Sequence, residues 1–428
     1  MPSPRSSGSA GPYRSAPAPE PAPAPASRSR PSPTTAPSST PLMALWVGFM
    51  ALVTYGSIYP FDFQYRPLDR DALAELVHGS WTYFSRGNAL GNVLLFAPLG
   101  FFGALLDRSR PIAWGWLAVV CGVSFILATA LQVVQLYLPG RVPNLQDVAW
   151  NMLGVAGGIA AAVLWRDSVR RLAVAGHRFQ LAPLVLTGVW LVYRLIPLVP
   201  SLSFQNIKDS VKPLLLSPEI TTLGVVGNIC AWLVVAQLLR LASPGRALDR
   251  YLALLILGTF GLEVLMVNNA VSADNVLGAG IAVVVWWLVI GRLRNPAGVV
   301  AVILIAVIVA SGLAPFTLRG PPQAFHWLPF QGFLGGSMYL NAQVACHKTF
   351  LYGSLVLLLW QARLGRMVAP SLAVGAVGAV EIAQIWLPGR TPEITDPLLV
   401  VLAAATLWAL QPSVPGRSGH RPEPARAE

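Results

Sequence analysis

Ten polar side chains recur within apolar stretches of the sequence, in two sets with a shared spacing. The first set consists of Asn92, Gln132, Gln135, Arg141, Asp147 and Asn151, and the second consists of Glu381, Gln384, Arg390 and Asp396. Arginine with asparagine or glutamine suits the anionic head group of a lipid, and a nearby carboxylate adjusts the charge or relays protons. The same residues are also able to tie helix ends together, with Arg141 paired to Asp147 and Arg390 paired to Asp396. The sequence alone leaves both interpretations open.

The stretches that carry these residues are typical of helices in a lipid bilayer. Only 11% of the 428 residues are charged and 54% are hydrophobic, whereas soluble domains carry about 25% charged residues. Apolar runs of roughly 20 residues, long enough to cross the hydrocarbon core, recur along the chain. We therefore predict an all-α polytopic membrane protein with about twelve transmembrane helices, at residues 42–58, 90–106, 112–138, 147–165, 183–200, 222–242, 250–267, 274–291, 297–314, 346–363, 368–387 and 394–410.

The two ends of the chain differ in composition from the apolar part. Residues 1–41 consist mainly of Pro, Ala, Ser and Arg, which predicts a disordered cytoplasmic tail. The apolar stretch begins too late for a signal peptide, so the first span is expected to stay uncleaved. Met43 is an alternative start, which leaves open whether residues 1–41 are translated. Residues 411–428 form a second predicted cytoplasmic tail.

The distribution of basic residues predicts the orientation in the membrane. If the N-terminus lies inside, the inside segments hold 20 of the 30 basic residues but only 6 of the 18 acidic ones. Such an excess follows the positive-inside rule, and it also favours contact with anionic lipid. Both termini are then cytoplasmic, and both polar sets face the outer side. The net charge of +12 needs no nucleic-acid partner to explain it.

The two polar sets belong to an internal repeat. Gln132 and Asp147 are 15 positions apart, as are Glu381 and Asp396, and Leu-Pro-Gly-Arg occurs at both 138–141 and 387–390. A fainter copy lies between them and consists of Pro197, Gly227, Asn228, Glu263 and Asp274. We therefore predict three related four-helix units, at residues 42–165, 183–291 and 297–410.

One helix face in the first unit combines polar and small residues. Asp147, Asn151, Gly154 and Gly158 follow each other at helical spacing within the predicted span 147–165. Glycines four positions apart allow two helices to approach closely in a membrane. The lower part of this face is therefore a predicted packing surface.

The first unit also carries the pattern of a known family. Residues 92–101 read Asn-Val-Leu-Leu-Phe-Ala-Pro-Leu-Gly-Phe, and Gln135, Arg141, Asp147, Asn151 and Gly154 follow. These residues are similar to the N-x-L-L-F-x-P-L-G and E-x-x-Q…R…D…N-x-x-G patterns of the VanZ-like family. The resemblance covers residues 88–158, with weaker matches at 381–396 and 195–280. Gln132 departs from the pattern, because the family usually has Glu at this place.

The resemblance implies a setting for the protein but no reaction. VanZ-like proteins are small bacterial membrane proteins, and the founding member is associated with low-level resistance to the glycopeptide teicoplanin. The expected location is therefore the bacterial plasma membrane. The terminal unit lacks the asparagine-led segment and the N-x-x-G, so neither outer unit carries the whole pattern.

Three functions remain as hypotheses. The first is a binder or translocator of an amphiphilic or anionic cell-envelope component, with membrane lipid or a lipid-linked cell-wall component as partner. The second is an extracytoplasmic-facing enzyme acting on a lipid-linked phosphate or sugar, which requires at least an arginine and an acid or base. The third is a structural or assembly role. No nucleophile motif stands out, and no metal-ligand spacing or cofactor motif occurs, so we predict neither a metal nor a cofactor.

Overall fold

The computed structural model describes residues 40–65, 67, 70, 74, 86–107, 109, 112–139, 141–174, 180–242, 248–317, 321–334 and 338–410. Within these ranges the secondary structure is helical, apart from isolated bridges between Pro200 and Met266 and between His326 and Glu393. The all-α prediction is therefore confirmed for this part of the chain. Most of the predicted N-terminal tail, residues 1–39, and the whole predicted C-terminal tail, residues 411–428, lie outside the described residues.

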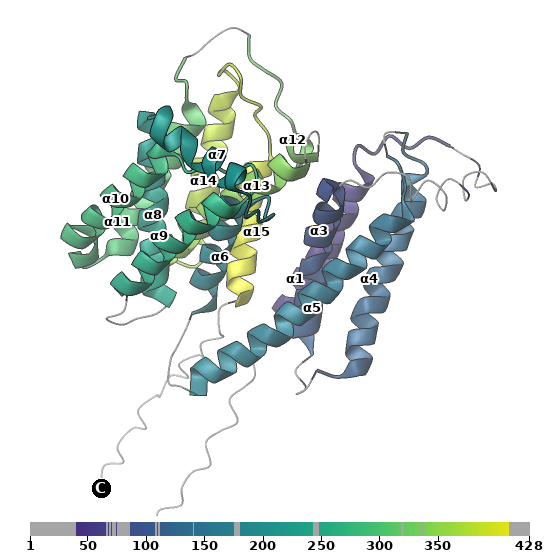
Figure 1. Cartoon of the computed structure of the whole chain (residues 1–428). Coiled ribbons are helices and arrows are strands. Elements are labelled where there is room, and N and C mark those ends of the chain that lie inside the picture. Colours follow the sequence, from purple (N-terminus) through teal and green to yellow (C-terminus); the bar gives the residue numbers. More distant parts are fainter. Residues whose placement is uncertain are drawn as a thin grey trace, which may run out of the picture. The chain divides into compact units, whose positions relative to one another are not determined.

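Taken four at a time in chain order, the long helices of the described residues make three groups, and their order can be followed by colour in Figure 1. The first group contains α1 (Thr40–Ile58), α3 (Arg86–Leu106), α4 (Trp114–Gln135) and α5 (Leu145–Val174). The middle group contains α6 (Leu181–Leu195), α8 (Thr222–Ala242), α9 (Leu248–Leu265) and α10 (Ala273–Leu288). The terminal group contains α11 (Pro296–Leu313), α13 (Met338–Gln361), α14 (Val368–Gln384) and α15 (Thr395–Leu410). Each predicted span coincides with one of these helices.

Seven helical segments are long and apolar enough to cross a bilayer. They are Asn88–Leu106, Trp114–Gln135, Leu145–Arg166, Thr222–Ala242, Ala273–Arg292, Pro296–Leu313 and Leu340–Gln361. Shorter apolar segments occur at Leu42–Ile58, Ala182–Leu195, Val368–Gln384 and Thr395–Trp408. The described chain is thus a multi-pass helical membrane protein, while the number of twelve spans stays a prediction.

Several predicted helix ends were wrong, and proline explains one of them. The predicted span 183–200 ends at Leu195, because Pro197 lacks the N–H that would continue the helix. The predicted spans 112–138 and 368–387 end at Gln135 and Gln384, a few residues before their Pro-Gly turns. Apolar runs locate the body of a helix well, but proline and the local turn decide where it stops.

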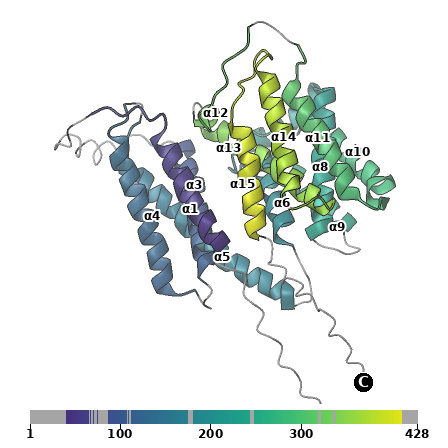
Figure 2. The same cartoon turned by 180° about the vertical axis from the view of Figure 1, so that it is seen from behind.

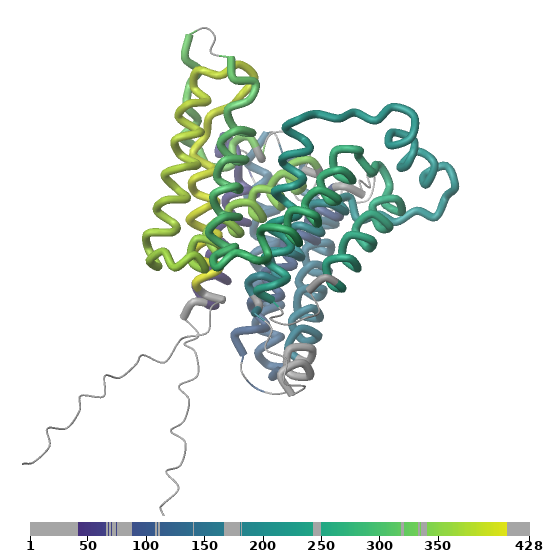
Figure 3. Tube along the Cα trace, turned by 90° about the vertical axis from the view of Figure 1, so that its left-hand side faces the viewer, coloured from purple at the N-terminus to yellow at the C-terminus, as the bar shows by residue number. Residues whose placement is uncertain are grey.

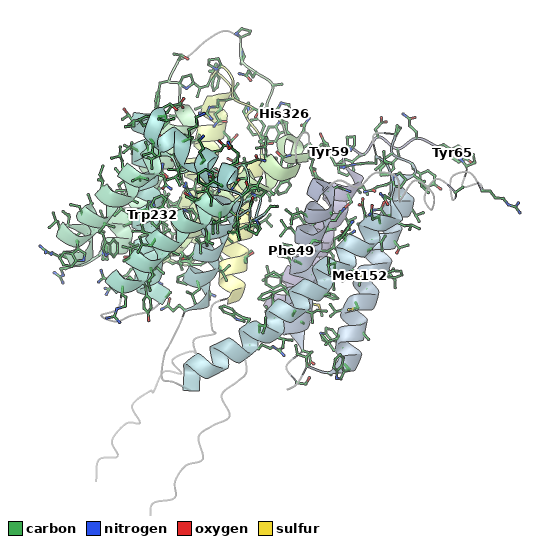
Figure 4. All side chains as sticks on the ribbon, viewed as in Figure 1. Phe49, Tyr59, Tyr65, Met152, Trp232 and His326 are labelled. Atoms are coloured by element: carbon green, nitrogen blue, oxygen red, sulfur yellow. The ribbon has the colours of Figure 1, made fainter. Side chains whose placement is uncertain are left out.

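Glycine allows α3 and α5 of the first group to pack closely. A Cβ atom added at Gly100, Gly154 or Gly158 would overlap a backbone carbonyl oxygen of the opposite helix. At Gly158 the overlapped oxygen belongs to Ala97. Phe96, Leu99 and Val155 are fully or almost fully buried beside this contact. The predicted packing surface is therefore confirmed. Figure 4 labels Phe49 and Met152, which pack against the same hydrophobic core.

A second and larger hydrophobic core joins the middle and terminal groups. Trp190 of α6 meets Trp232 of α8 edge to face, with ring centroids 4.7 Å apart. Leu304 of α11 and Leu355 of α13 are completely buried in the same core. Helices α14 and α15 pack against each other, and they lie side by side in the view from behind (Figure 2). The middle and terminal groups therefore share one core.

Short helices in the connections were not predicted. They are α7 (Phe204–Leu216), the 3-10 helix Ile290–Arg292 and α12 (Gln331–Leu334). Helix α7 lies in the connection between α6 and α8, which is drawn in teal in Figure 3. Ser203 caps its start by accepting a hydrogen bond from the N–H of Asn206. The charged residues Lys208 and Lys212 interrupt the apolar pattern there, so the sequence does not resemble a membrane span.

Candidate functional site

The arginine of the first polar set binds the end of α1. The Nε atom of Arg141 donates to the carbonyl of Tyr59 at 3.2 Å, and Nη2 donates to the carbonyl of Gly56 at 3.2 Å. The Nε2 atom of Gln135 donates to the neighbouring carbonyl of Ser57 at 3.0 Å. The last carbonyls of a helix have no partner within the helix and carry partial negative charge, so a guanidinium group is a good cap for them.

The second polar set makes the same contacts at the end of α11. The Nη2 atom of Arg390 donates to the carbonyl of Ser311 at 2.7 Å, and Nε donates to that of Ala314 at 2.9 Å. The Nε2 atom of Gln384 donates to the carbonyl of Gly312 at 3.1 Å. The two arginines and their glutamines therefore have equivalent places, and both hold helix ends.

The expected pairs of arginine with aspartate were wrong. Asp147 accepts a hydrogen bond from Nδ2 of Asn88 at 2.8 Å. Asp396 accepts from Nζ of Lys348 at 2.5 Å and from the hydroxyl of Tyr352 at 2.6 Å. The guanidinium groups of Arg141 and Arg390 instead face carbonyl groups, because the preceding turn brings them to a helix C-terminus.

Gln132 and Glu381 also have matching roles. The Oε1 atom of Gln132 accepts a hydrogen bond from the backbone N–H of Asn144 at 2.7 Å. The Oε2 atom of Glu381 accepts one from the backbone N–H of Glu393 at 2.9 Å. Both side chains are buried. An amide oxygen thus replaces a carboxylate at Gln132 without loss of this hydrogen bond.

The two asparagines of the first set lie in the first helix group, where Asn151 is buried and Asn92 is partly buried. Nδ2 of Asn92 and Oδ1 of Asn151 have no hydrogen-bond partner within the part of the chain that the structure describes. Asn151 is only 3% exposed. Their position near the contact of α3 and α5 assigns them to the interior of that group.

The middle group has an ion pair that the sequence did not single out. Nε and Nη2 of Arg194, at the end of α6, both lie 2.6 Å from Oε1 of Glu263 in α9. The side chain of Glu263 is completely buried. A buried charge is stable only with a close partner, so the pair holds Arg194 in a fixed place.

A cavity of about 540 Å³ lies between the middle and terminal groups. Its walls come from α6, α8, α11, α13 and α14 and from the segment that leads into α15. Its polar lining residues are Arg194, Asn228, His347, Lys348, Tyr352, Glu381, Gln384, Arg390, Glu393 and Asp396. The structure therefore brings the whole second set together with the middle group, whereas no residue of the first set lines this cavity.

Several lining residues were missed as candidates. Arg194 and Lys348 are charged residues within predicted spans, and such charges usually mark a functional place. That signal was available for both. Asn228 belongs to the fainter middle repeat, which was its signal, whereas Glu393 is a loop residue with no comparable signal. His347 stacks on Tyr193 with ring centroids 4.4 Å apart. Among the described residues, no group of three His, Cys, Asp or Glu side chains is arranged to hold a metal ion.

The fold and the cavity define a class: a multi-pass helical membrane protein with both charge signs lining one internal site. Within this class, residues 31–166 match the model of the VanZ/LLP1 family. The match spans most of the first helix group and confirms the resemblance predicted from the Asn92–Phe101 segment and the polar residues after it. No curated protein and no solved structure matches the chain.

Proposed function

We propose that the protein binds or translocates an amphiphilic or anionic component of the cell envelope at its outer face. In this proposal the chain lies in the bacterial plasma membrane with twelve spans in three four-helix units, and both termini are cytoplasmic. A link to glycopeptide resistance follows only from the family resemblance. Lipid and lipid-linked cell-wall components are the partners that this role requires.

Equivalent hydrogen bonds support the arrangement in units. Arg141 and Arg390 cap the first helices of the outer groups, α1 and α11. In the middle group, Nδ2 of Asn269 donates to the carbonyl of Arg194 near the end of α6, at 2.7 Å. A polar residue after the third long helix thus binds the end of the first in each group. Repeated bundles of this kind are common in membrane transporters.

The cavity is the observation that carries the proposed function. Its volume of about 540 Å³ falls in the range of small-molecule sites, about 300–1,000 Å³. The helix ends that line it, at Arg194, Ser311 and Gln384, precede connections for which the positive-inside rule predicts an outer position. Polar groups gathered at the outer end of an apolar bundle suit a ligand with a polar head and an apolar body.

An alanine comparison tests this role. Arg390→Ala and the double variant Lys348→Met/Asp396→Asn change the cavity, while Arg141→Ala and Asp147→Ala change the first helix group. We expect the cavity variants to keep normal membrane abundance and to lose an envelope phenotype such as glycopeptide tolerance. Loss of abundance in every variant would contradict the proposal and favour a structural role. Turnover of a head group by the purified protein would instead identify an enzyme.

The predicted orientation has a separate test. Pro143→Cys and Pro392→Cys place thiols in the two turns predicted to lie outside, after replacement of the native Cys121, Cys230 and Cys346. A membrane-impermeant thiol reagent applied to intact cells is expected to label both positions. Labelling only after the cells are broken would reverse the topology and remove the basis for an outer site.

A further inference from the structure

From the lining of the cavity we infer that it recognises a phosphate ester, with Arg194 and Arg390 as the two groups that hold the phosphate. This inference rests on the proposed binding function and narrows its ligand. One of the two cations, Arg194, belongs to the middle helix group and lies outside residues 31–166, which match the family model. The site is therefore complete only when the middle and terminal groups are together.

Both arginines keep hydrogen-bond donors for a ligand. Arg194 uses Nε and Nη2 for Glu263, and Arg390 uses Nε and Nη2 for the carbonyls of Ser311 and Ala314. Within the described residues, Nη1 of neither arginine forms a hydrogen bond or an ion pair. Each guanidinium group is held at one edge and open at the other, which is the preorganised state that favours anion recognition.

The acids of the cavity, in contrast, are engaged by donors of the protein. Both carboxylate oxygens of Asp396 accept hydrogen bonds, from Lys348 and Tyr352. One oxygen of Glu381 accepts from the N–H of Glu393, and one oxygen of Glu393 accepts from the N–H of Gly332 at 3.3 Å. Among the described residues Arg390 forms no ion pair, and its guanidinium group contacts the carbonyls of Ser311 and Ala314. The open Nη1 donors of Arg194 and Arg390 are therefore the groups of the lining that favour an anion.

The size and walls of the cavity describe the rest of the ligand. A volume of about 540 Å³ exceeds the share of one liquid water, about 30 Å³, many times over, and leaves room for a body attached to the phosphate. Leu223, Val307, Ile308 and Leu351 supply apolar wall beside the polar residues. Glycines at 224, 227 and 312 also line the cavity, so the backbone is accessible to a ligand. These features fit a phosphate monoester or diester that carries an organic group.

Binding by the purified full-length protein in a phosphate-free detergent tests the inference. The probes are short-chain phosphatidic acid, glycerol 3-phosphate, inorganic phosphate and a phosphate-free glycolipid of similar chain length, each titrated in native mass spectrometry. We expect Arg390→Gln to weaken binding of phosphatidic acid at least tenfold. Arg141→Gln is the matched control, because it loses the same helix-capping hydrogen bonds outside the cavity; its affinity should stay within twofold of wild type.

Arg194 needs a paired substitution. Arg194→Gln alone would leave the buried carboxylate of Glu263 without a charged partner. The double variant Arg194→Gln/Glu263→Gln replaces the ion pair by two uncharged amides that are able to hydrogen-bond to each other. We expect this variant also to lose at least tenfold in affinity for phosphatidic acid, with normal folding by size-exclusion chromatography. Arg390→Lys retains the charge without the planar group, and an affinity between those of wild type and Arg390→Gln would support recognition by the guanidinium group.

The outcomes separate the inference from the broader proposal. Binding of glycerol 3-phosphate as well as phosphatidic acid would identify a soluble ester as a source of the ligand, while binding of phosphatidic acid alone would identify a lipid head group. Equal affinities in wild type and both cavity variants, or no binding of any phosphate probe, would overturn the inference. In that case retained glycolipid binding keeps the proposed function, and loss of all amphiphile binding removes it too.

Discussion

The first and terminal helix groups use one framework for different purposes. Arg141 and Arg390 cap corresponding helix ends, and Gln135 and Gln384 assist them at corresponding carbonyls. The residues that differ at matching repeat positions are those that line the cavity. Lys348 donates to Asp396 as Asn88 of the first group donates to Asp147, and Glu381 stands where the first group has Gln132. The repeated residues therefore build the shared framework, and in the terminal group the repeated Arg390 lines the cavity together with the substituted residues.

The two interpretations of the polar residues, joining helix ends and binding an anion, suit different parts of the molecule. In the first group, Asn151 and the Nδ2 atom of Asn92 are buried, and Gln132 accepts a hydrogen bond from the backbone, which suits a structural role. In the terminal group, the same framework carries three extra ionisable side chains, Lys348, Tyr352 and Glu393, in the cavity wall. The structural role explains why the spacing recurs, and the ionisable lining gives one copy the groups that the proposed ligand requires.

The largest expected effect concerns the close packing of the first group. A methyl group at Gly158 would overlap the carbonyl of Ala97, whereas Gly157 next to it has open space. We expect Gly158→Ala to lower the free energy of unfolding by about 3 kcal/mol, measured for the purified protein in detergent micelles. Gly157→Ala should change it by less than about 0.5 kcal/mol, as is usual for substitutions away from packed contacts.

The terminal group does not depend on glycine in this way. Ala403 and Leu407 occupy the repeat positions of Gly154 and Gly158, and Leu407 is buried. Equal stability losses for the two glycine variants would show that the observed approach of α3 and α5 is not needed. That result would contradict the structural role that the comparison assigns to the first group.

A smaller effect is expected from the ion pair of the terminal group. Lys348→Met leaves the buried carboxylate of Asp396 with Tyr352 as its remaining partner among the contacts described. Removing one partner of a largely buried pair is costly, and because Lys348 is 26% exposed we expect a loss of about 2 kcal/mol. Asn92→Leu, in α3 of the first group, should cost less than about 1 kcal/mol, because the buried Nδ2 atom that it removes has no partner among the described residues.

The double variant Lys348→Met/Asp396→Asn sharpens this test. It removes both charges and should recover most of the lost stability, while ligand binding stays impaired. The free energy of unfolding and the ligand affinity are measured on the same preparations. Recovery of both quantities would mean that the ion pair serves stability alone, against the proposed site.

The sequence allowed the helices to be predicted, because apolar runs and the Pro-Gly turns after Leu138 and Leu387 depend on neighbouring residues. The faces of Gln135 and Gln384 also followed from helical spacing. The partner of Arg390 did not, since a nearby Asp396 and a distant carbonyl of Ala314 compete, and only the packed helices decide between them. The same limit hid the cavity, whose Arg194 and Lys348 are 154 positions apart.

The smallest expected stability effect carries the most information about the site. Glu381→Gln keeps an oxygen that accepts from the N–H of Glu393, as Gln132 does for Asn144 in the first group. The free energy of unfolding should therefore change by less than about 1 kcal/mol, the usual net value of a hydrogen bond. If the carboxylate of Glu381 takes part in function, ligand binding or the envelope phenotype changes although stability does not.

Gln132→Glu, the reverse exchange, should leave function unaltered, because Gln132 lies outside the cavity lining. Unchanged function in both variants would mean that Glu381 serves only the framework that the two groups share. The cationic residues would then be the ones that bind the proposed ligand.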